Sequence, residues 1–261
     1  MTKNLVITVS GKGGVGKTTF SALLLQVLIK NSPKKIILVV DADPDSNLPD
    51  VLGIEVPRCD TVGGAAFSLK KQIEKGTIPP GTTKKQILES DVFKILKEEE
   101  HFDLLTMGRC EGDGCYCFPN QLLTGIVDNL GENYDIILMD MEAGLEHLSR
   151  RTAKDVDIMF IITDPSQMGI KTAERIKELT KEVNISFKKM YIIGNRFSSD
   201  MEKMLEEASK KIGIELAGII PQDPQVSEYN FLGKPVTELK DSEAYKAVEK
   251  IARKIGLVNH N

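Results

Sequence analysis

A glycine-rich segment between an apolar run and a helical pattern constrains the fold more than any other feature of the sequence. Residues 11–18 read Gly-Lys-Gly-Gly-Val-Gly-Lys-Thr, after the apolar run Leu5–Val9 and at the start of the helical pattern Thr18–Lys30. A strand that turns through glycines into a helix presents backbone N–H groups and the positive end of a helix dipole, which together hold phosphate oxygens. The order therefore predicts an α/β fold with a phosphate site after its first strand.

The rest of the chain repeats this alternation of apolar runs and helical patterns. Short runs rich in Val and Ile predict strands buried on both faces of a parallel sheet, at Leu5–Val9, Ile36–Val40, Leu104–Met107, Ile136–Met139, Ile158–Thr163, Met190–Gly194 and Leu216–Ile220. Helices are predicted at Thr18–Lys30, Gln121–Leu130, Ile170–Glu182, Asp200–Ile212 and Ser242–Ile255. We predict a doubly wound, mostly parallel sheet flanked by helices, the P-loop NTPase fold.

The length of the chain suits one large domain. With 261 residues, 41% of them hydrophobic, it can bury a substantial core. We predict a single P-loop ATPase domain over residues 1–261. The segment Asp50–Glu100 fits the alternation least, because it holds Gly63-Gly64, Pro79-Pro80-Gly81 and a charged helical pattern near Lys84–Glu100. We expect it to be an insertion, around residues 50–100, that packs on one side of the sheet.

The net charge of the chain and the length of its apolar runs indicate which classes of partner, and which cellular location, to expect. Thirty-four basic and thirty-eight acidic residues give a net charge of −4, without a long Lys/Arg run, so nucleic acid is not an expected partner. The apolar run before Ser10 is too short for a signal peptide, and no later run approaches a membrane span. We expect a cytoplasmic protein without stable membrane association, in which thiols stay reduced.

The glycine-rich segment matches G-x-x-x-x-G-K-[ST] throughout, which predicts that the protein binds ATP or ADP with Mg²⁺. Lys17 is predicted to reach the β- and γ-phosphates, and the Thr18 hydroxyl to bind the magnesium ion. The predicted nucleotide contacts are Gly11, Lys12, Gly13, Gly14, Val15, Gly16, Lys17, Thr18 and Thr19.

Two acidic loops follow predicted strands, at Asp41–Asp45 and at Asp140–Gly144. Ligands of open α/β sheets bind beyond the carboxyl ends of the strands, so both loops are expected beside the γ-phosphate. Asp140 suits a water-mediated contact with Mg²⁺, and Asp43 suits a group that orients or deprotonates the attacking water. The Gly144 N–H is expected to contact the γ-phosphate. The alternative is that these aspartates only cap turns.

Lys12 makes the segment resemble the deviant Walker A motif, K-G-G-x-G-K-[ST]. The family with that motif includes the septum-site and plasmid-partitioning ATPases, the arsenical pump ATPase and the nitrogenase iron protein. The resemblance implies that Lys12 acts on the phosphates of a partner chain, so that hydrolysis requires a homodimer. It also implies that Asn195, Pro221 and Asp223 lie near the adenine. The expected catalytic residues are then Lys12, Lys17, Asp43 and Asp140.

Three of the four cysteines lie within a glycine-rich loop predicted at residues 108–118. Reduced Cys115 and Cys117, in a Cys-x-Cys pattern, supply two thiolates that suit Ni²⁺, Zn²⁺, Cu⁺ or an iron–sulfur unit. Two thiolates fall short of a closed four-coordinate site, which two loops in a dimer would complete. Three interpretations of Cys110 stay open: a small buried residue, a third metal ligand, or a redox-prone neighbour of the other two cysteines. Cys59 is expected to be a small buried hydrophobic residue.

Two further patterns resemble one subgroup of the family, the CooC-type accessory ATPases that mature nickel carbon monoxide dehydrogenase. The residues that match are Gly108, Arg109, Gly112, Gly114, Cys115, Tyr116 and Cys117, then Asp140, Glu142, Ala143, Gly144, Glu146 and His147. Met141 stands where threonine is usual, and Cys110 is an addition. The resemblance implies an ATP-driven metallochaperone that binds nickel between two protomers and delivers it to apo carbon monoxide dehydrogenase or acetyl-CoA synthase. Zinc is expected to bind the same thiolates in vitro.

Two alternative functions use the same sequence features. An iron–sulfur carrier would bridge a cluster between two copies of the cysteine loop. A positioning or partitioning ATPase would act on membrane or DNA, and membrane-binding members end in a basic amphipathic helix. The last predicted helix has only a modest apolar stripe, formed by Val248, Ile251 and Ile255, and we expect it to pack on the sheet.

Overall fold

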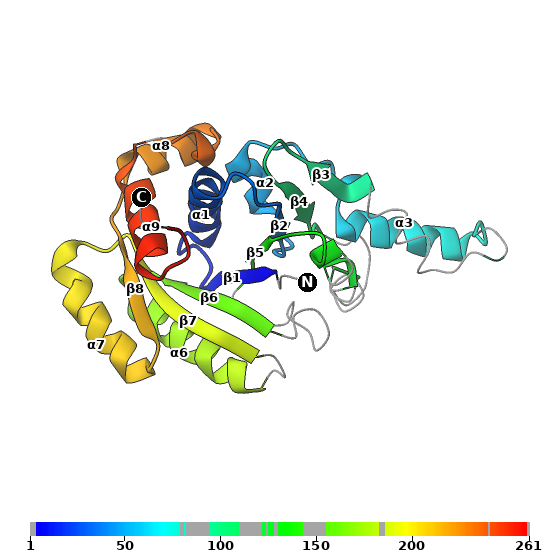
Figure 1. The fold of residues 1–261 in the computed structure, drawn as a ribbon. Helices are drawn as coiled ribbons and strands as arrows, with labels where there is room; N and C mark the ends of the chain where they lie inside the picture. Colours follow the sequence, from blue (N-terminus) through cyan, green and yellow to red (C-terminus); the bar gives the residue numbers. More distant parts are fainter. Residues whose placement is uncertain are drawn as a thin grey trace.

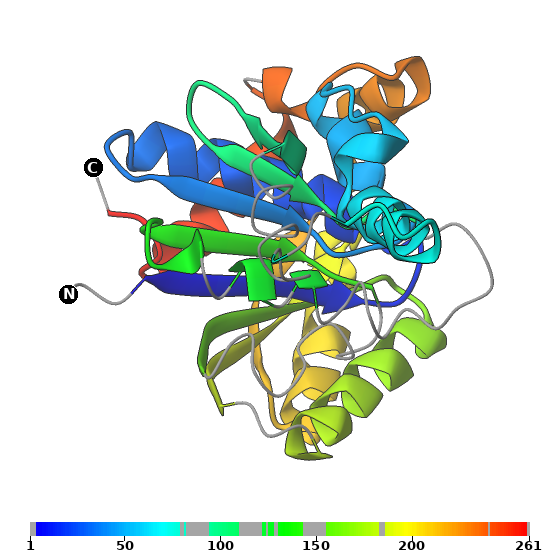
Figure 2. The same cartoon turned by 90° about the vertical axis from the view of Figure 1, so that its right-hand side faces the viewer.

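The computed structural model describes residues 4–78, 81, 94–109, 122–123, 125–127, 130–142, 155–182, 186–239 and 241–259. Within these residues the fold centres on an eight-stranded sheet of order β3-β4-β2-β5-β1-β6-β7-β8 (Figures 1 and 2). The strands are β1 Leu5–Gly11, β2 Ile37–Asp41, β3 Leu96–Glu98, β4 Asp103–Thr106, β5 Ile136–Asp140, β6 Asp155–Thr163, β7 Ser186–Asn195 and β8 Glu215–Ile220. All seven predicted strands are present.

The strand pairs run parallel, except that β3 and β4 are antiparallel. β1 lies between β5 and β6, with Leu5 opposite Ile136 and Ile7 opposite Ile158. β2 and β5 are buried at every residue, as their Val- and Ile-rich sequences predict for strands covered on both faces. The prediction of a doubly wound, mostly parallel sheet is confirmed.

Helices cover both faces of the sheet, and each face has its own apolar cluster. On one face α1 (Lys17–Asn31) lies between α2 (Asn47–Leu52) and α9 (Glu243–Lys254), as Figure 1 shows. On the other face lie α6 (Gln167–Glu182) and α7 (Glu202–Ile212). The predicted helix Gln121–Leu130 is described only in part, and its described residues are helical and pack against this second face.

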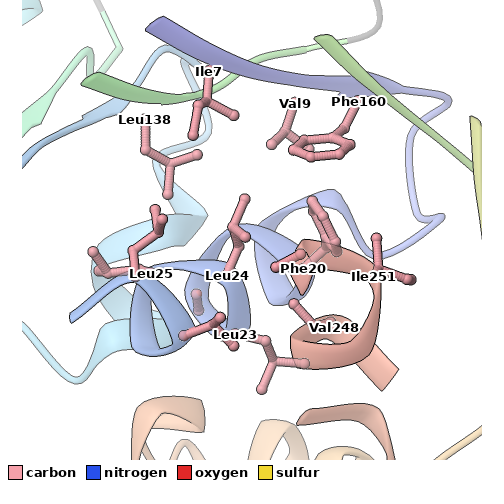
Figure 3. Close-up of a cluster of buried hydrophobic side chains, with 14 of the residues drawn as sticks. Ile7, Val9, Phe20, Leu23, Leu24, Leu25, Leu138, Phe160, Val248 and Ile251 are labelled. Carbon is pink, nitrogen blue, oxygen red and sulfur yellow. The ribbon is translucent and has the colours of Figure 1, made fainter. Parts of the chain in front are cut away.

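Helix α1 is buried along most of its length, which explains its consecutive apolar residues. Figure 3 shows Phe20 and Leu24 of α1 pointing at Val9 of β1 and Phe160 of β6. The rings of Phe20 and Phe160 meet edge to face, with centroids 5.3 Å apart. Val248 of α9 closes the same cluster and is fully buried. The expectation that the last helix packs on the sheet is confirmed, and the start of α1 is held firmly in place.

Further helices were not predicted. They are α2, α3 (Val62–Glu74), which Figure 1 shows extending away from the sheet, α8 (Pro224–Leu232), and the short 3-10 turns Arg58–Asp60, Ser199–Met201 and Val236–Glu238. α3 begins where the Thr61 hydroxyl accepts a hydrogen bond from the Gly64 N–H at 3.0 Å, which is a helix N-cap. The Gly63-Gly64 pair lies in the first turn of this helix, and it is one reason why the segment fits the strand–helix alternation poorly.

Two expectations about the segment around residues 50–100 are wrong. Leu96–Glu98 is a strand, not the end of a charged helix, because it pairs with β4 at the sheet edge while the Lys97 ammonium contacts the Asp60 carboxylate at 3.0 Å. Cys59 is exposed, because it lies in the surface turn Arg58–Asp60. Residues 82–93, which carry most of the predicted charged helix, lie outside the described residues.

None of the described helices combines the length and the apolar character that crossing a membrane requires.

Candidate nucleotide site

A cavity of about 490 Å³ lies at the carboxyl ends of β1, β2, β7 and β8. This is the edge of an open α/β sheet at which ligands bind. The predicted site residues that line it are Gly13, Gly14, Gly16, Lys17, Thr18, Thr19, Asp43, Asn195, Pro221 and Asp223. Of the other predicted site residues, Gly11, Lys12, Val15 and Asp140 lie outside the lining, and Gly144, Cys115 and Cys117 lie outside the described residues.

The glycine loop has the backbone geometry that a phosphate cradle needs. Gly14 and Gly16 have φ values of 78° and 91°, in the left-handed region that favours glycine. The Asn195 amide donates to the Val15 carbonyl at 2.7 Å, and the Arg196 guanidinium donates to the Gly14 carbonyl at 2.6 Å. These two hydrogen bonds hold the loop in place, and the first N–H groups of α1, which have no partner within the helix, are available to an anion.

The Lys17 side chain is folded across the loop. It is only 7% exposed, and its ammonium donates to the Lys12 carbonyl at 3.4 Å. A buried ammonium at a helix N-terminus provides strong local positive potential. Together with the loop amides it suits a polyphosphate.

Asp140 is a buried carboxylate behind the loop. It is 2% exposed, and burial raises its pKa from 3.8 to about 6, while the Thr18 hydroxyl, the Lys17 ammonium and the Ser21 hydroxyl act in the opposite direction. Its Oδ1 atom has no hydrogen-bond partner among the described residues. A buried acceptor without a partner is costly, so this oxygen is suited to a metal-bound water.

Asp41 is opposite Asp140 in the sheet and shapes the loop that follows β2. One carboxylate oxygen accepts from the Asp43 N–H and the other from the Leu48 N–H, each at 3.1 Å. Burial, and then the charge of Asp140, raise the pKa of Asp41 well above its usual range. Asp41 therefore fixes the position of Asp43, which lines the cavity.

Lys12 lies outside the cavity of its own chain. Its ammonium is 3.9 Å from an Asp164 carboxylate oxygen, and its side chain is 39% exposed. The glycine loop thus holds one lysine inward, Lys17, and one lysine at the surface.

The far end of the cavity is formed by the segment after β8 and by α8. Asp223 lines it, but both of its carboxylate oxygens are used: one accepts from the Gln225 N–H and one from the Ala244 N–H, each at 2.9 Å. Asp223 therefore caps α8 and also contacts the first turn of α9. Gln222, which stands between the two predicted residues Pro221 and Asp223, also lines it, and the lining residues that sequence reasoning missed here are Val226, Ser227 and Asn230. The Asp223-Pro224 pair is typical of a helix start, and it is the signal in the sequence from which α8 could have been found.

Further missed residues line the phosphate end, namely Asp45, Asn47, Glu142 and Arg196. Asp45 and Glu142 lie in the acidic loops, where the sequence offers several carboxylates and no rule to choose among them. No cluster of three or more metal-binding side chains is present within the described part of the chain. The predicted Cys115–Cys117 site is outside that part.

Comparisons with known proteins place this arrangement in a family. Residues 6–236 match the CobQ/CobB/MinD/ParA nucleotide binding domain. An uncharacterised ATP-binding protein of Methanocaldococcus jannaschii is 48% identical over 252 residues, covering 96% of this chain and 98% of that protein. The carbon monoxide dehydrogenase accessory protein CooC of Rhodospirillum rubrum is 29% identical over 250 residues, 92% of each chain.

Among solved structures, the MinD cell division protein of Aquifex aeolicus is similar, with a TM-score of 0.67 and 23% identity over 99% of this chain and 98% of that one. At this identity the likeness shows the fold alone. The family match covers most of the chain, and the M. jannaschii relative aligns with nearly all of it. The protein therefore belongs to the CobQ/CobB/MinD/ParA family of P-loop nucleotide-binding proteins.

Proposed function

We propose that the protein is a magnesium-dependent ATPase and a metallochaperone, which binds nickel through Cys115 and Cys117 at a homodimer interface. Its client is apo carbon monoxide dehydrogenase or acetyl-CoA synthase. The observation that carries the proposal is the Cys-x-Cys pattern in a chain that is 29% identical to a carbon monoxide dehydrogenase accessory protein over 92% of both. The nucleotide cavity supports the ATPase half of the proposal.

In the ATPase step, the glycine-loop amides and Lys17 bind the phosphates. The lining residue Thr18 and the unpartnered Oδ1 of Asp140 fit a magnesium ion, the first directly and the second through water. A magnesium ion held by these residues would neutralise charge on the transferred phosphoryl group. Asp43, held by the Asp41 carboxylate, orients or deprotonates the attacking water.

The adenine is assigned to the far end of the cavity. Pro221 lines it there, whereas Asn195 lines the cavity beside the glycine loop, where its amide donates to the Val15 carbonyl. Asp223 acts indirectly, through the α8 and α9 starts that it caps. Gly144 keeps its role toward the γ-phosphate as a prediction from the sequence.

The homodimer is proposed from Lys12. Its surface position beside Asp164, outside its own cavity, supports a role on the phosphates of a partner chain. Lys12→Ala is expected to abolish ATP hydrolysis and ATP-induced dimerisation while nucleotide binding by the monomer is retained. Phosphate release and gel filtration measure the first two, and Lys210→Ala, which breaks an exposed ion pair on α7, is the control. Full hydrolysis by Lys12→Ala would refute the role in trans.

The metal site is tested by anaerobic gel filtration with metal analysis, on wild type and on a Cys115→Ser, Cys117→Ser double variant with added Ni²⁺ or Zn²⁺. We expect one metal per two chains and a dimer in wild type, and neither in the double variant, because two loops together supply four thiolates. Metal retained by the double variant would contradict the site. A brown visible chromophore in place of nickel–thiolate bands would identify an iron–sulfur carrier instead.

A positioning or partitioning ATPase is the second candidate, since the family description includes MinD and ParA. Its membrane-binding form would need a free apolar face on the last helix. Val248 and Ile251 of α9 are 0% and 5% exposed, so that face is covered by the sheet, which favours the metallochaperone. Sedimentation with anionic vesicles and ATP distinguishes the two, because pelleting that requires the last helix would support the positioning ATPase.

A further inference from the structure

We infer that Ser46 and Arg109 are positioning residues that couple the occupancy of the nucleotide cavity to the start of the cysteine segment. The contacts that carry this inference lie wholly within the described residues. The identity of the coupled ligand, nickel, rests on the proposed function.

Ser46 connects the loop after β2 to the residue that precedes Arg109. The loop's neighbouring residues Asp45 and Asn47 line the cavity, whereas Ser46 does not. The Ser46 hydroxyl accepts a hydrogen bond from the Gly108 N–H at 3.1 Å. The same hydroxyl is 3.5 Å from the carbonyls of Asp43 and Pro44, to which it donates. Since a hydroxyl has one donor and two acceptor positions, it joins the backbone at Asp43 to the backbone at Gly108.

Ser46 also has an uncommon backbone conformation. Its φ is 51°, one of two positive φ values among the described non-glycine residues. A non-glycine residue in the left-handed region is held there by its surroundings, and such residues gather at sites that switch. The loop that bears Asp43 therefore holds Ser46 in an uncommon backbone conformation, and the Ser46–Gly108 hydrogen bond is one of the contacts that maintain it.

Arg109 makes a second contact between the same two segments, from the residue after Gly108 to the residue before Ser46. Its guanidinium Nε donates to Asp45 Oδ1 at 3.1 Å, and its Nη2 donates to the same oxygen. The side chains are 70% and 58% exposed, so the ion pair alone contributes little to stability. We infer that the pair instead transmits changes in position. Asp45 lines the cavity, so a phosphate bound there is expected to move or repel the Asp45 carboxylate to which Arg109 is bonded.

Residues 107–109 also contact β2 and the start of α3. The Met107 N–H donates to the Asp41 carbonyl and its carbonyl accepts from the Gly63 N–H, both at 2.8 Å. Gly108 has a φ of 69°, and a Cβ there would lie 2.3 Å from the Thr61 hydroxyl oxygen. The segment is therefore clamped between the cavity loop and the start of α3. In the sequence Arg109 directly precedes Cys110 and the Cys115-x-Cys117 pattern, so movement of the cavity loop shifts the point from which the cysteines extend.

Coupling of this kind is reciprocal, since a nucleotide that changes the metal affinity by some factor has its own affinity changed by the same factor. For wild type we expect that factor to be about 5-fold or more, the usual lower range for coupled sites. In a Ser46→Ala, Arg109→Gln double variant it should fall to about 1, with the nucleotide affinity itself within about twofold of wild type because neither residue lines the cavity.

The test measures Ni²⁺ binding to the full chain, with and without a non-hydrolysable ATP analogue and Mg²⁺, by anaerobic titration. Arg109→Lys, which keeps a cation beside Asp45, should retain more of the coupling than Arg109→Gln does. Lys210→Ala, which breaks an exposed ion pair on α7, should retain all of it. Undiminished coupling in the double variant overturns the inference.

A second readout separates failure of the inference from failure of the proposed function. Amide hydrogen exchange over residues 107–109 is measured with the analogue alone, without metal. If wild type binds no nickel, the metallochaperone proposal fails and this exchange decides the inference. A nucleotide response in wild type that Ser46→Ala abolishes supports the coupling, and an exchange rate that is unaffected by the analogue in wild type refutes it.

Discussion

Replacing Asp140 by asparagine should make the nucleotide-free protein more stable, although Asp140 is one of the residues that we propose to act in ATP hydrolysis. Asp140 is 2% exposed, and its Oδ1 atom has no hydrogen-bond partner within the described residues. Asparagine has nearly the same shape and carries no charge, so the buried site no longer has to accommodate an ion. Because the ionised Asp140 lowers the free energy of unfolding of the nucleotide-free protein, we expect its replacement to be stabilising even though it lies in the proposed active site.

The magnitude follows from the pKa of Asp140, which burial raises from 3.8 to about 6 in the folded state. At about 1.4 kcal/mol per pH unit, a difference of roughly two units corresponds to ~3 kcal/mol of lost stability when the carboxyl is ionised. Because the folded state binds its proton more tightly than the unfolded state, this stability is fully present below about pH 4 and is lost as the pH rises through about 6. Asp41, whose pKa burial and Asp140 raise, contributes with the same sign.

The assay is urea unfolding without nucleotide or Mg²⁺ at pH 5 and pH 8. We expect Asp140→Asn to be more stable than wild type by up to ~3 kcal/mol at pH 8, with a smaller difference at pH 5. With Mg²⁺ and ATP the wild type should recover the difference, since a ligand that binds only the folded state stabilises it. A variant that is less stable than wild type at pH 8 without ligand would refute the reasoning.

Asp157→Asn is the matched control. Its carboxylate accepts from the Val6 N–H at 2.9 Å and pairs with the Lys188 ammonium. Because the Asp157 carboxylate is paired in the folded protein, Asp157→Asn should weaken these interactions and lower the free energy of unfolding by about 1 kcal/mol at either pH. The opposite signs at Asp140 and Asp157 separate an uncompensated buried carboxylate from a paired one.

Two further substitutions test the construction of the cavity. Gly11→Ala should prevent folding or lower the melting temperature severely, because the φ of Gly11 is 150° and a Cβ there would lie 2.3 Å from the Ile162 carbonyl oxygen. Gly13→Ala is the control: a Cβ at Gly13 would have nothing within 4 Å, so this variant should melt close to wild type. Asp223→Ala should lower the free energy of unfolding by about 1–3 kcal/mol in urea, because two helix starts lose a hydrogen-bond acceptor. An unchanged unfolding midpoint would contradict the capping role of Asp223.

The sequence predicts the central part of the fold well, for a physical reason. Strands such as β2 and β5 are buried on both faces, so their apolar runs are nearly continuous and hard to confuse with surface segments. The glycine loop is equally clear, because its φ values and its position before α1 follow from the residue types. Strand order is not encoded in this local way and depends on contacts between distant segments.

The elements that sequence reasoning missed have weak local patterns. β3 is three residues long and exists only because β4 offers a free edge. α8 has no buried residues among Pro224–Leu232, so it lacks an apolar stripe to recognise. In the site, the sequence brings Asp223 to the cavity but gives no sign that its two oxygens are occupied by Gln225 and Ala244. A carboxylate's partners are a tertiary property.

The central place of β1 has a consequence for how the protein is made. β1 leaves the ribosome well before both of its neighbours in the sheet, since Leu5 is opposite Ile136 of β5 and Ile7 is opposite Ile158 of β6. At about 5–20 residues per second, synthesis leaves this apolar segment without one or both partners for roughly 7–30 s. Throughout that interval its unpaired edges are available to other chains. Nascent chains of this protein are therefore expected to depend on ribosome-associated chaperones that shield residues 5–11 until β6 has emerged.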